Sequence, residues 1–419
     1  MNKYQSYAGY FGALTIILLS FGLIYLEKFA IIGSITDKFI FLIVAITFIV
    51  MAIAELFLQK RYRQKNNHQI KYLALSRSSF YILKSSFFRF LALFLPFLFF
   101  YLLVQKHTFF SISTREFFDY LFYIFVFVGF PYIFFTLKYK GDKSYEFGDY
   151  AILTIIGVKS FFYLLFYKSY KDKFYNNRRV KKVWLVYLVN LIFLSLMTQF
   201  ITNELYGLRD EFNIFISYQS NTIDWYSRYK TFYLILFHLL FTIDVSIALI
   251  GYSFASRWLN NRTKSVDTTL SGWMVALMCY PPLNSVTSQF IPYYGLDTYQ
   301  LITNEYLLAI VLTLLIFLYT VYVWATIALG FKFSNLTNRG IVNIGPYKYV
   351  RHPAYISKNF AWWIDNTFVL TNIWASIALG LWNLVYIARA LTEERHLKKD
   401  KEYQEYCKKV KYRFIVKII

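Results

Sequence analysis

Arginine, histidine, tyrosine and glutamate side chains gather in two short stretches near the C-terminus, and these groups could bind a polar cofactor or grip an anion. The first stretch, Gly345 to Tyr355, reads Gly-Pro-Tyr-Lys-Tyr-Val-Arg-His-Pro-Ala-Tyr. Glycine tolerates backbone angles that other residues avoid, whereas proline fixes φ and is accepted in the first turn of a helix. The stretch is therefore predicted to form a polar loop that leads into a helix at Pro353. Basic, aromatic stretches also serve as simple interfacial anchors, so that reading stays open.

The second stretch closes the last long apolar segment and contains Arg389, Glu393 and Glu394. Arg389 and Glu393 are four residues apart and share a helix face, so they could form only a weak ion pair at a solvated helix end. A fixed guanidinium could instead bind carboxylate or phosphate oxygens in a bidentate way. The apolar segments between the two stretches are expected to form a helical hairpin that returns the chain to the same membrane face.

The apolar composition of the chain defines its fold class. Of 419 residues, 58% are hydrophobic, 22% aromatic and only 16% charged, whereas soluble domains are usually about 25% charged. Apolar runs long enough to cross a bilayer recur, and the short alternating segments of a β-barrel are absent from the sequence. We expect an all-α, polytopic helical membrane protein with about ten transmembrane helices. The expected spans are about 7–26, 39–58, 90–104, 117–137, 183–200, 231–252, 272–292, 306–330, 353–370 and 372–390.

The net charge of +22 comes from lysines and arginines that gather in the short loops between apolar runs. This is the positive-inside pattern, with attraction to anionic lipid, and it argues against nucleic-acid binding because no soluble basic domain is visible. The basic loops 59–89 and 168–182 and the C-terminal tail are predicted to face the cytoplasm. The segment 149–167 lies between two basic loops and is expected to be interfacial or re-entrant. Abundant Lys, Asn, Ile, Phe and Tyr favour a bacterial inner membrane as the location.

Metal chemistry and disulfides are not expected. Cys279 and Cys407 lie far apart, and the five histidines form no HExxH or clustered pattern. Three ionisable residues, Glu55, His238 and Asp244, fall inside apolar runs. They are predicted to make hydrogen bonds between helices, with a proton-relay or transport role as the open alternative.

The two C-terminal stretches together resemble the isoprenylcysteine carboxyl methyltransferase and phospholipid methyltransferase superfamily of integral membrane enzymes. The shared pattern is Gly-x-Tyr, a spacer, Arg-His-Pro-x-Tyr, a hairpin, Arg-x-x-x-Glu-Glu and a tyrosine-rich tail, over roughly residues 330–415. The resemblance implies S-adenosylmethionine as cofactor and methyl transfer to a lipid or lipid-like acceptor at the cytoplasmic face. It places the acceptor at Arg389 and the cofactor at Arg339, Gly340, Ile341, Val342, Tyr347, His352, Pro353, Ala354, Tyr355 and Glu393.

The residues add two constraints on that chemistry. No Gly-x-Gly-x-x-Gly motif follows a strand-like run, so any cofactor must be held by helices and loops. The absence of an obvious general base favours an anionic acceptor and O-methylation, because attack of an anion on a sulfonium needs no proton removal. The tail departs from the family pattern at Val416, where proline is common, and it lacks the glycine usually found before Tyr403.

The chain is expected to divide near the polar stretch 201–229, which we interpret as an outer loop. Residues 231–419 would then form the methyltransferase-like region, while residues 1–230 have no counterpart in small family members and their role is open. Two other functions stay open as well. One is an NADPH-dependent membrane reductase of the sterol-reductase type, which carries a similar Arg-His-Pro-x-Tyr loop. The other is a transporter or scaffold with a vestigial C-terminal region.

Overall fold

A computed structural model describes residues 4–65, 78–140, 178–218, 224–291, 302–366 and 372–417. The N-terminal helices in this part of the chain are α1 (Ala8–Lys28), α2 (Asp37–Lys65), α3 (Ser79–Lys106), α4 (Ile112–Lys140), α7 (Arg178–Ser217) and α8 (Trp225–Ser253). The C-terminal helices are α9 (Leu270–Leu277), α10 (Leu283–Phe290), α11 (Glu305–Leu329), α12 (Pro353–Asp365), α13 (Ile373–Leu397) and α14 (Lys401–Lys409). The segment 149–167 lies outside the described residues.

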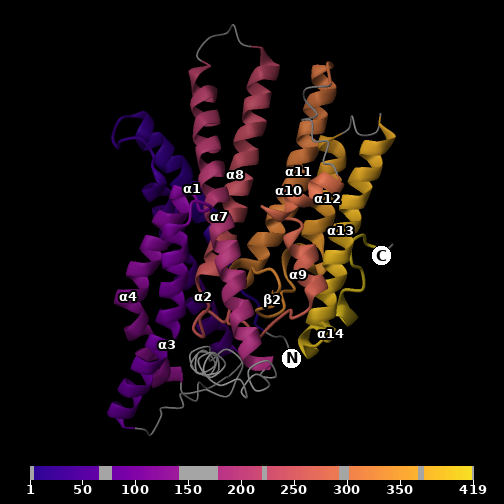
Figure 1. The fold of residues 1–419 in the computed structure, drawn as a ribbon. Helices are drawn as coiled ribbons and strands as arrows, with labels where there is room; N and C mark the ends of the chain where they lie inside the picture. The colour runs from indigo at the N-terminus through magenta and orange to yellow at the C-terminus, as the bar shows by residue number, and fades with distance from the viewer. Residues whose placement is uncertain are drawn as a thin grey trace.

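From α3 onward, the long helices lie in sequence order across the molecule. Figure 1 shows α3 and α4 at one side, α7 and α8 in the middle, and α11 to α13 at the other side. Among the described residues, eight helices are long and apolar enough to cross a membrane: α1, α2, α3, α4, α7, α8, α11 and α13. The expected all-α, polytopic membrane fold is therefore confirmed.

Two of the ten expected spans are shorter than predicted. In place of the expected span 272–292, the described residues form two helices of 8 residues each, α9 and α10, on either side of the Pro281-Pro282 pair, which cannot continue a helix. The described helix of the expected span 353–370, α12, has 13 residues and ends at Asp365. At 1.5 Å per residue it is about 20 Å long, less than the roughly 30 Å hydrocarbon core of a bilayer.

The stretch 201–229, expected as an outer loop, is mostly helical. Helix α7 runs for 40 residues to Ser217, and α8 begins at Trp225. Ile201, Leu205 and Leu208 are at most 1% exposed and recur at helical spacing, so they bury one face of this extension despite its charged residues. The two helices pack side by side over most of their length (Figure 1).

One hydrophobic core crosses the expected boundary near residue 230. It contains buried residues from Ala8 to Leu336, with Ile201, Leu205 and Leu208 of α7 packed in the same cluster as Ile247 and Ile250 of α8. The two regions thus share a core, and their division by function stays a prediction.

Two of the three ionisable residues inside the helices, Asp244 and His238, make the predicted hydrogen bonds between helices, whereas Glu55 bonds within its own helix and to the segment before α1. Asp244 accepts hydrogen bonds from Tyr322 and Thr326, so its carboxylate connects α8 to α11. Glu55 accepts hydrogen bonds from Ser6 and Gln59, and His238 Nδ1 lies 2.9 Å from Glu204 Oε2 of α7.

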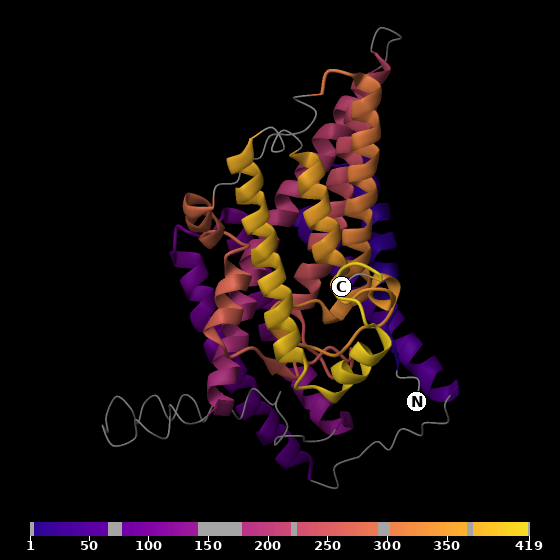
Figure 2. The same ribbon diagram turned by 90° about the vertical axis from the view of Figure 1, so that its right-hand side faces the viewer.

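A small strand pair joins the segments that follow α8 and α11. Strands β1 (Ser265–Val266) and β2 (Thr337–Asn338) pair in antiparallel register. The pairing holds the segment after α11 against the chain that leaves α8. In Figure 2 this segment lies near α14, at the end of the molecule where the N-terminus is found.

Helix α1 approaches α11 closely at Gly9. A Cβ atom on Gly9 would lie 2.0 Å from the backbone oxygen of Ile327 and 3.2 Å from Gly330 Cα. Close to this contact, Trp324 Nε1 donates a 2.9 Å hydrogen bond to Tyr10 Oη. The contact therefore fixes the end of α11 from which the motif segment departs.

We expect Gly9→Ala to destabilise the protein by about 1–3 kcal/mol, the usual cost of forcing atoms into a packed interface. Gly22→Ala in the same helix is the matched control, because a Cβ there meets nothing within 4 Å. Thermal unfolding in detergent measures the difference. A Gly9→Ala midpoint equal to that of Gly22→Ala would disprove the close packing of α1 on α11.

Candidate active site

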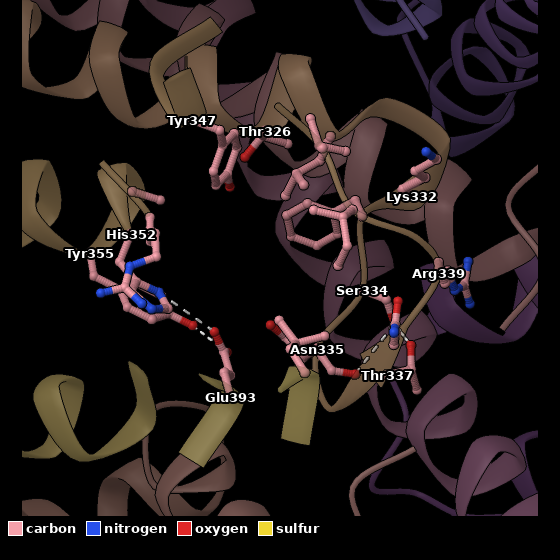
Figure 3. A pocket seen from close by; sticks show the side chains of 18 of the residues that line it. Thr326, Lys332, Ser334, Asn335, Thr337, Arg339, Tyr347, His352, Tyr355 and Glu393 are labelled. Carbon is pink, nitrogen blue, oxygen red and sulfur yellow. Dashed lines mark hydrogen bonds and ion pairs between the residues drawn. The ribbon is translucent and has the colours of Figure 1, made fainter. Parts of the chain in front are cut away.

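A cavity of about 190 Å³ lies where α11, α12 and α13 end against the segment 330–352 and α14. Ten of the eleven site residues predicted from the sequence line it: Arg339, Gly340, Ile341, Val342, Tyr347, His352, Ala354, Tyr355, Arg389 and Glu393. Figure 3 shows His352, Tyr355 and Glu393 on one side of the space, with Asn335 and Thr337 on the other. Folding therefore brings the two sequence stretches together around one cavity.

Pro353, the remaining predicted residue, does not line the cavity. It is buried as the first residue of α12, where its missing N–H costs no helical hydrogen bond. Gly345 and Gly340 shape the wall through their backbones, since both have positive φ values, +57° and +111°. Gly345 also lies so close to Trp324 and Tyr10 that a Cβ would approach them to about 3 Å.

Glu393 points into the cavity from the end of α13 and is bound by two neighbours. The hydroxyl of Tyr355 donates a hydrogen bond to Glu393 Oε1, and Arg389 Nε lies 3.4 Å from the same oxygen. Its other oxygen lies 3.9 Å from His352 Nδ1. Residues of both sequence stretches thus meet at a single carboxylate.

Arg389 is not part of a solvated helix end. It is 4% exposed, and its Nη2 donates a 2.6 Å hydrogen bond to Asn335 Oδ1. Its guanidinium lies over the rings of Tyr280 and Tyr355, 5.3 and 5.2 Å from their centroids. Such packing holds the planar group in one orientation, as bidentate binding of an anion requires.

His352 is held between two aromatic rings. Its imidazole stacks on Tyr355, with ring centroids 5.4 Å apart, and lies 5.7 Å from the ring of Phe414. Its Nε2 lies 3.4 Å from Glu394 Oε1, and its backbone N–H donates a 2.9 Å hydrogen bond to the carbonyl of Arg413. The ring is therefore fixed in both position and tilt.

Glu394, next to Glu393, points away from the cavity and is 1% exposed. Arg351 Nη1 lies 3.1 Å from Glu394 Oε1, and Arg413 Nε lies 3.2 Å from both carboxylate oxygens. Lys398, one turn later in α13, is 3.6 Å away. This buried carboxylate joins the first stretch and the tail to α13.

The tail closes the cavity beside the motif segment. Tyr406 donates a 2.8 Å hydrogen bond to the carbonyl of Tyr347, and the N–H of Arg351 donates one of 3.0 Å to the carbonyl of Tyr412. Burial raises the pKa of Tyr347 and of Tyr406 further above the ordinary tyrosine value, so both hydroxyls are protonated and can donate hydrogen bonds.

Arg339, a predicted cofactor contact, has a second role in the structure. Its Nη1 donates a hydrogen bond to the backbone oxygen of Gly251 in α8, and its head points away from the cavity centre (Figure 3). The residue lines the cavity with its backbone and stem while its charge anchors the wall to α8.

Among the cavity-lining residues that sequence reasoning did not single out, five bear on the chemistry of the site: Tyr280, Tyr322, Asn335, Lys358 and Tyr386. Four of them belong to no motif and reach the site only through folding. Lys358 carried a usable signal, because a lysine inside an apolar segment of a membrane protein marks a functional position by default.

These features define an α-helical membrane protein with a polar cavity at one end of its C-terminal helices. Residues 307–399, in the C-terminal part of the chain, match the sequence model of the Isoprenylcysteine carboxyl methyltransferase (ICMT) family. The matched range includes most of α11, the cavity-lining segment, α12 and α13, which confirms the resemblance inferred from the two stretches. No curated protein and no solved structure is significantly similar to the chain.

We expect Glu394→Gln to destabilise the protein by about 1–3 kcal/mol, because it removes the buried negative charge that Arg351 and the partly exposed Arg413 bind. Glu405→Gln, at an exposed position of α14, is the control. Unfolding midpoints, together with limited proteolysis of the tail, measure the effect. Equal midpoints for the two variants would contradict the role of Glu394 in joining the tail to α13.

Proposed function

We propose that the protein is an integral membrane methyltransferase that uses S-adenosylmethionine and acts on a lipid-like acceptor with an acidic group. The observation that carries the proposal is the convergence of ten predicted site residues on one cavity within the ICMT-family region. The positive-inside pattern supports a cytoplasmic position for this end of the molecule.

The donor set around the cavity suits this cofactor. Tyr347 offers a flat ring for the adenine and a cation–π surface for a sulfonium, while His352 and Tyr355, whose ring faces already pack on neighbouring groups, offer polar edges. Glu393 offers a carboxylate for the ribose hydroxyls or the ammonium group, and the backbone of residues 339–342 offers further polar groups. We therefore assign cofactor binding to the part of the cavity that these residues line.

When bound, the cofactor supplies a methyl group: an acceptor oxygen attacks the methyl carbon, the carbon–sulfur bond breaks, and its electron pair stays on sulfur. The task of the protein is to hold the two reactants in line and exclude water, which contributes several kcal/mol. Arg389 would bind the acidic group of the acceptor through its fixed guanidinium. A carboxylate has no proton to lose, so this reaction needs no general base.

The charge around the cavity favours an acidic acceptor over an amine. Glu393 is the one carboxylate among the described residues that line it, and Arg351 is already paired with Glu394. The remaining cations are Lys332, Arg339, Lys358 and Arg389. A protonated amine would add a further positive charge beside the sulfonium, whereas a carboxylate offsets one.

His352→Ala and Glu393→Ala should each weaken S-adenosylmethionine binding by ~1–3 kcal/mol, the range for losing a buried polar contact. Lys348→Ala, at an exposed neighbouring position, should leave the affinity unchanged. Calorimetry on the folded, full-length variants is the measurement. Titration with NADPH provides the decisive contrast, because binding of NADPH in place of S-adenosylmethionine would favour a reductase and overturn the proposal.

Arg389→Lys should lower turnover at least ~10-fold, equivalent to ~1.4 kcal/mol in the barrier, while changing cofactor affinity less than about twofold. The substitution keeps the charge but removes the planar fork that binds two oxygens at once. Transfer of a labelled methyl group into a lipid extract measures turnover. Near-normal turnover would mean that Arg389 serves only to hold Glu393 and Asn335.

A further inference from the structure

Lys358 is a basic side chain that lines the cavity, and the proposed function assigns it neither to cofactor binding nor to acceptor binding. It lies three residues after Tyr355 in α12, so the two side chains share one helix face, and Lys358 lies deeper by about one turn. Its ammonium is ringed by aromatic side chains, 5.8 Å from the centroid of Tyr322, 5.2 Å from Trp362 and 5.8 Å from Tyr386.

No carboxylate of the described residues lies within 4 Å of the Lys358 ammonium. Asp244, the acid in the neighbouring helix α8, is bound by the hydroxyls of Tyr322 and Thr326 instead. Cation–π contacts offset only about 0.5–2 kcal/mol of the cost of placing an ammonium at such a position. The charge is therefore suited to a partner that enters the cavity.

Lys358 and Arg389 face each other across α12 and α13 with two tyrosines between them. Tyr355 and Lys358 are three residues apart on α12, and Tyr386 and Arg389 are three residues apart on α13. Arg389 lies over Tyr355, Lys358 lies over Tyr386, and the two tyrosine rings meet edge to face with centroids 5.6 Å apart. Two cations thus flank one aromatic surface that lines the cavity.

Arg389 also retains binding capacity. Its Nε is directed at Glu393 and its Nη2 at Asn335, while its Nη1 makes no hydrogen bond to another described residue. A carboxylate that entered between the two cations would meet donors from both helices. Tyr322 and Tyr386, which line the cavity, would provide an apolar wall for the attached chain.

We infer that Lys358 determines the specificity of the site for an apolar molecule that ends in a carboxylate, which it binds together with Arg389. This inference rests on the proposed function and names the acidic group of the acceptor. Lys358 is a specificity residue in this assignment and takes no part in binding the cofactor. Carboxylates are selected over neutral or cationic head groups because a negative charge is needed to pair with the buried Arg389 and the half-buried Lys358.

The test compares hexadecanoate with hexadecanamide, which share a C16 chain and differ in charge, on the full-length protein in nanodiscs of neutral lipid. Tryptophan fluorescence reports binding, since Trp362 borders Lys358. We expect the wild type to bind hexadecanoate at least ~10-fold more tightly than hexadecanamide. Lys358→Gln should reduce this ratio at least ~5-fold, and Lys358→Arg should retain most of it.

Two further measurements separate specificity from structure. Lys348→Gln, an exposed lysine of the same region, should leave the acid-to-amide ratio unchanged. Lys358→Met should keep or raise the unfolding midpoint, because removing a half-buried cation that has no carboxylate partner among the described residues does not cost stability, yet it should lose the preference for the acid. S-Adenosylmethionine affinity should stay within about twofold in every Lys358 variant.

An unchanged acid-to-amide ratio in Lys358→Gln, or no preference for the acid in the wild type, would overturn the inference. A parallel loss of S-adenosylmethionine binding in the Lys358 variants would also overturn it, because Lys358 would then belong to the cofactor site. Failure of the wild type to bind S-adenosylmethionine would instead count against the proposed function, so the two failures are distinguishable.

Discussion

Four basic side chains, Arg351, His352, Lys398 and Arg413, converge on the carboxylate of Glu394, which the end of α13 holds almost entirely out of solvent. A negative charge near a helix C-terminus is disfavoured by the helix dipole, and burial adds a desolvation cost. The converging basic side chains offset these two costs. Glu394 therefore joins the first stretch, α13 and the tail to one another. Successive residues of a helix point about 100° apart, which leaves Glu393 free to face the cavity. Of the two adjacent glutamates, Glu394 therefore joins the segments around the site, and Glu393 is available to bind a ligand in the cavity.

The N-terminal region supports this site from behind. None of its described residues lines the cavity, yet Gln5 accepts a hydrogen bond from the N–H of Asn343, and Tyr10 packs against Val342 and Ile344. From the other side, α8 supplies the Gly251 carbonyl to Arg339 and the Tyr252 hydroxyl to the N–H of Asn335. The segment after α11, which contains little regular secondary structure, is thus held along much of its length by contacts from outside residues 307–399.

The membrane fold and the part of the site that belongs to the two sequence stretches could be predicted because they depend on local patterns. Apolar runs define spans, and the motif residues are close together in sequence within each stretch. The prediction failed where tertiary packing outweighs local polarity, as in α7, whose charged extension is stabilised by Ile201, Leu205 and Leu208. Asn335 and Tyr280 could not be found, since their contact with Arg389 exists only after α9 and the segment beyond α11 fold against α13.

The backbone hydrogen bonds from Arg351 and His352 to the carbonyls of Tyr412 and Arg413 have a consequence for biosynthesis. Proteins are made from the N-terminus, and their earlier parts fold first. Residues 410–415, which hold Arg351 and His352 in place from behind the cavity, are made after every described membrane-spanning helix. A chain whose synthesis stops before residue 410 would therefore contain all of these helices and lack this support for the cavity wall.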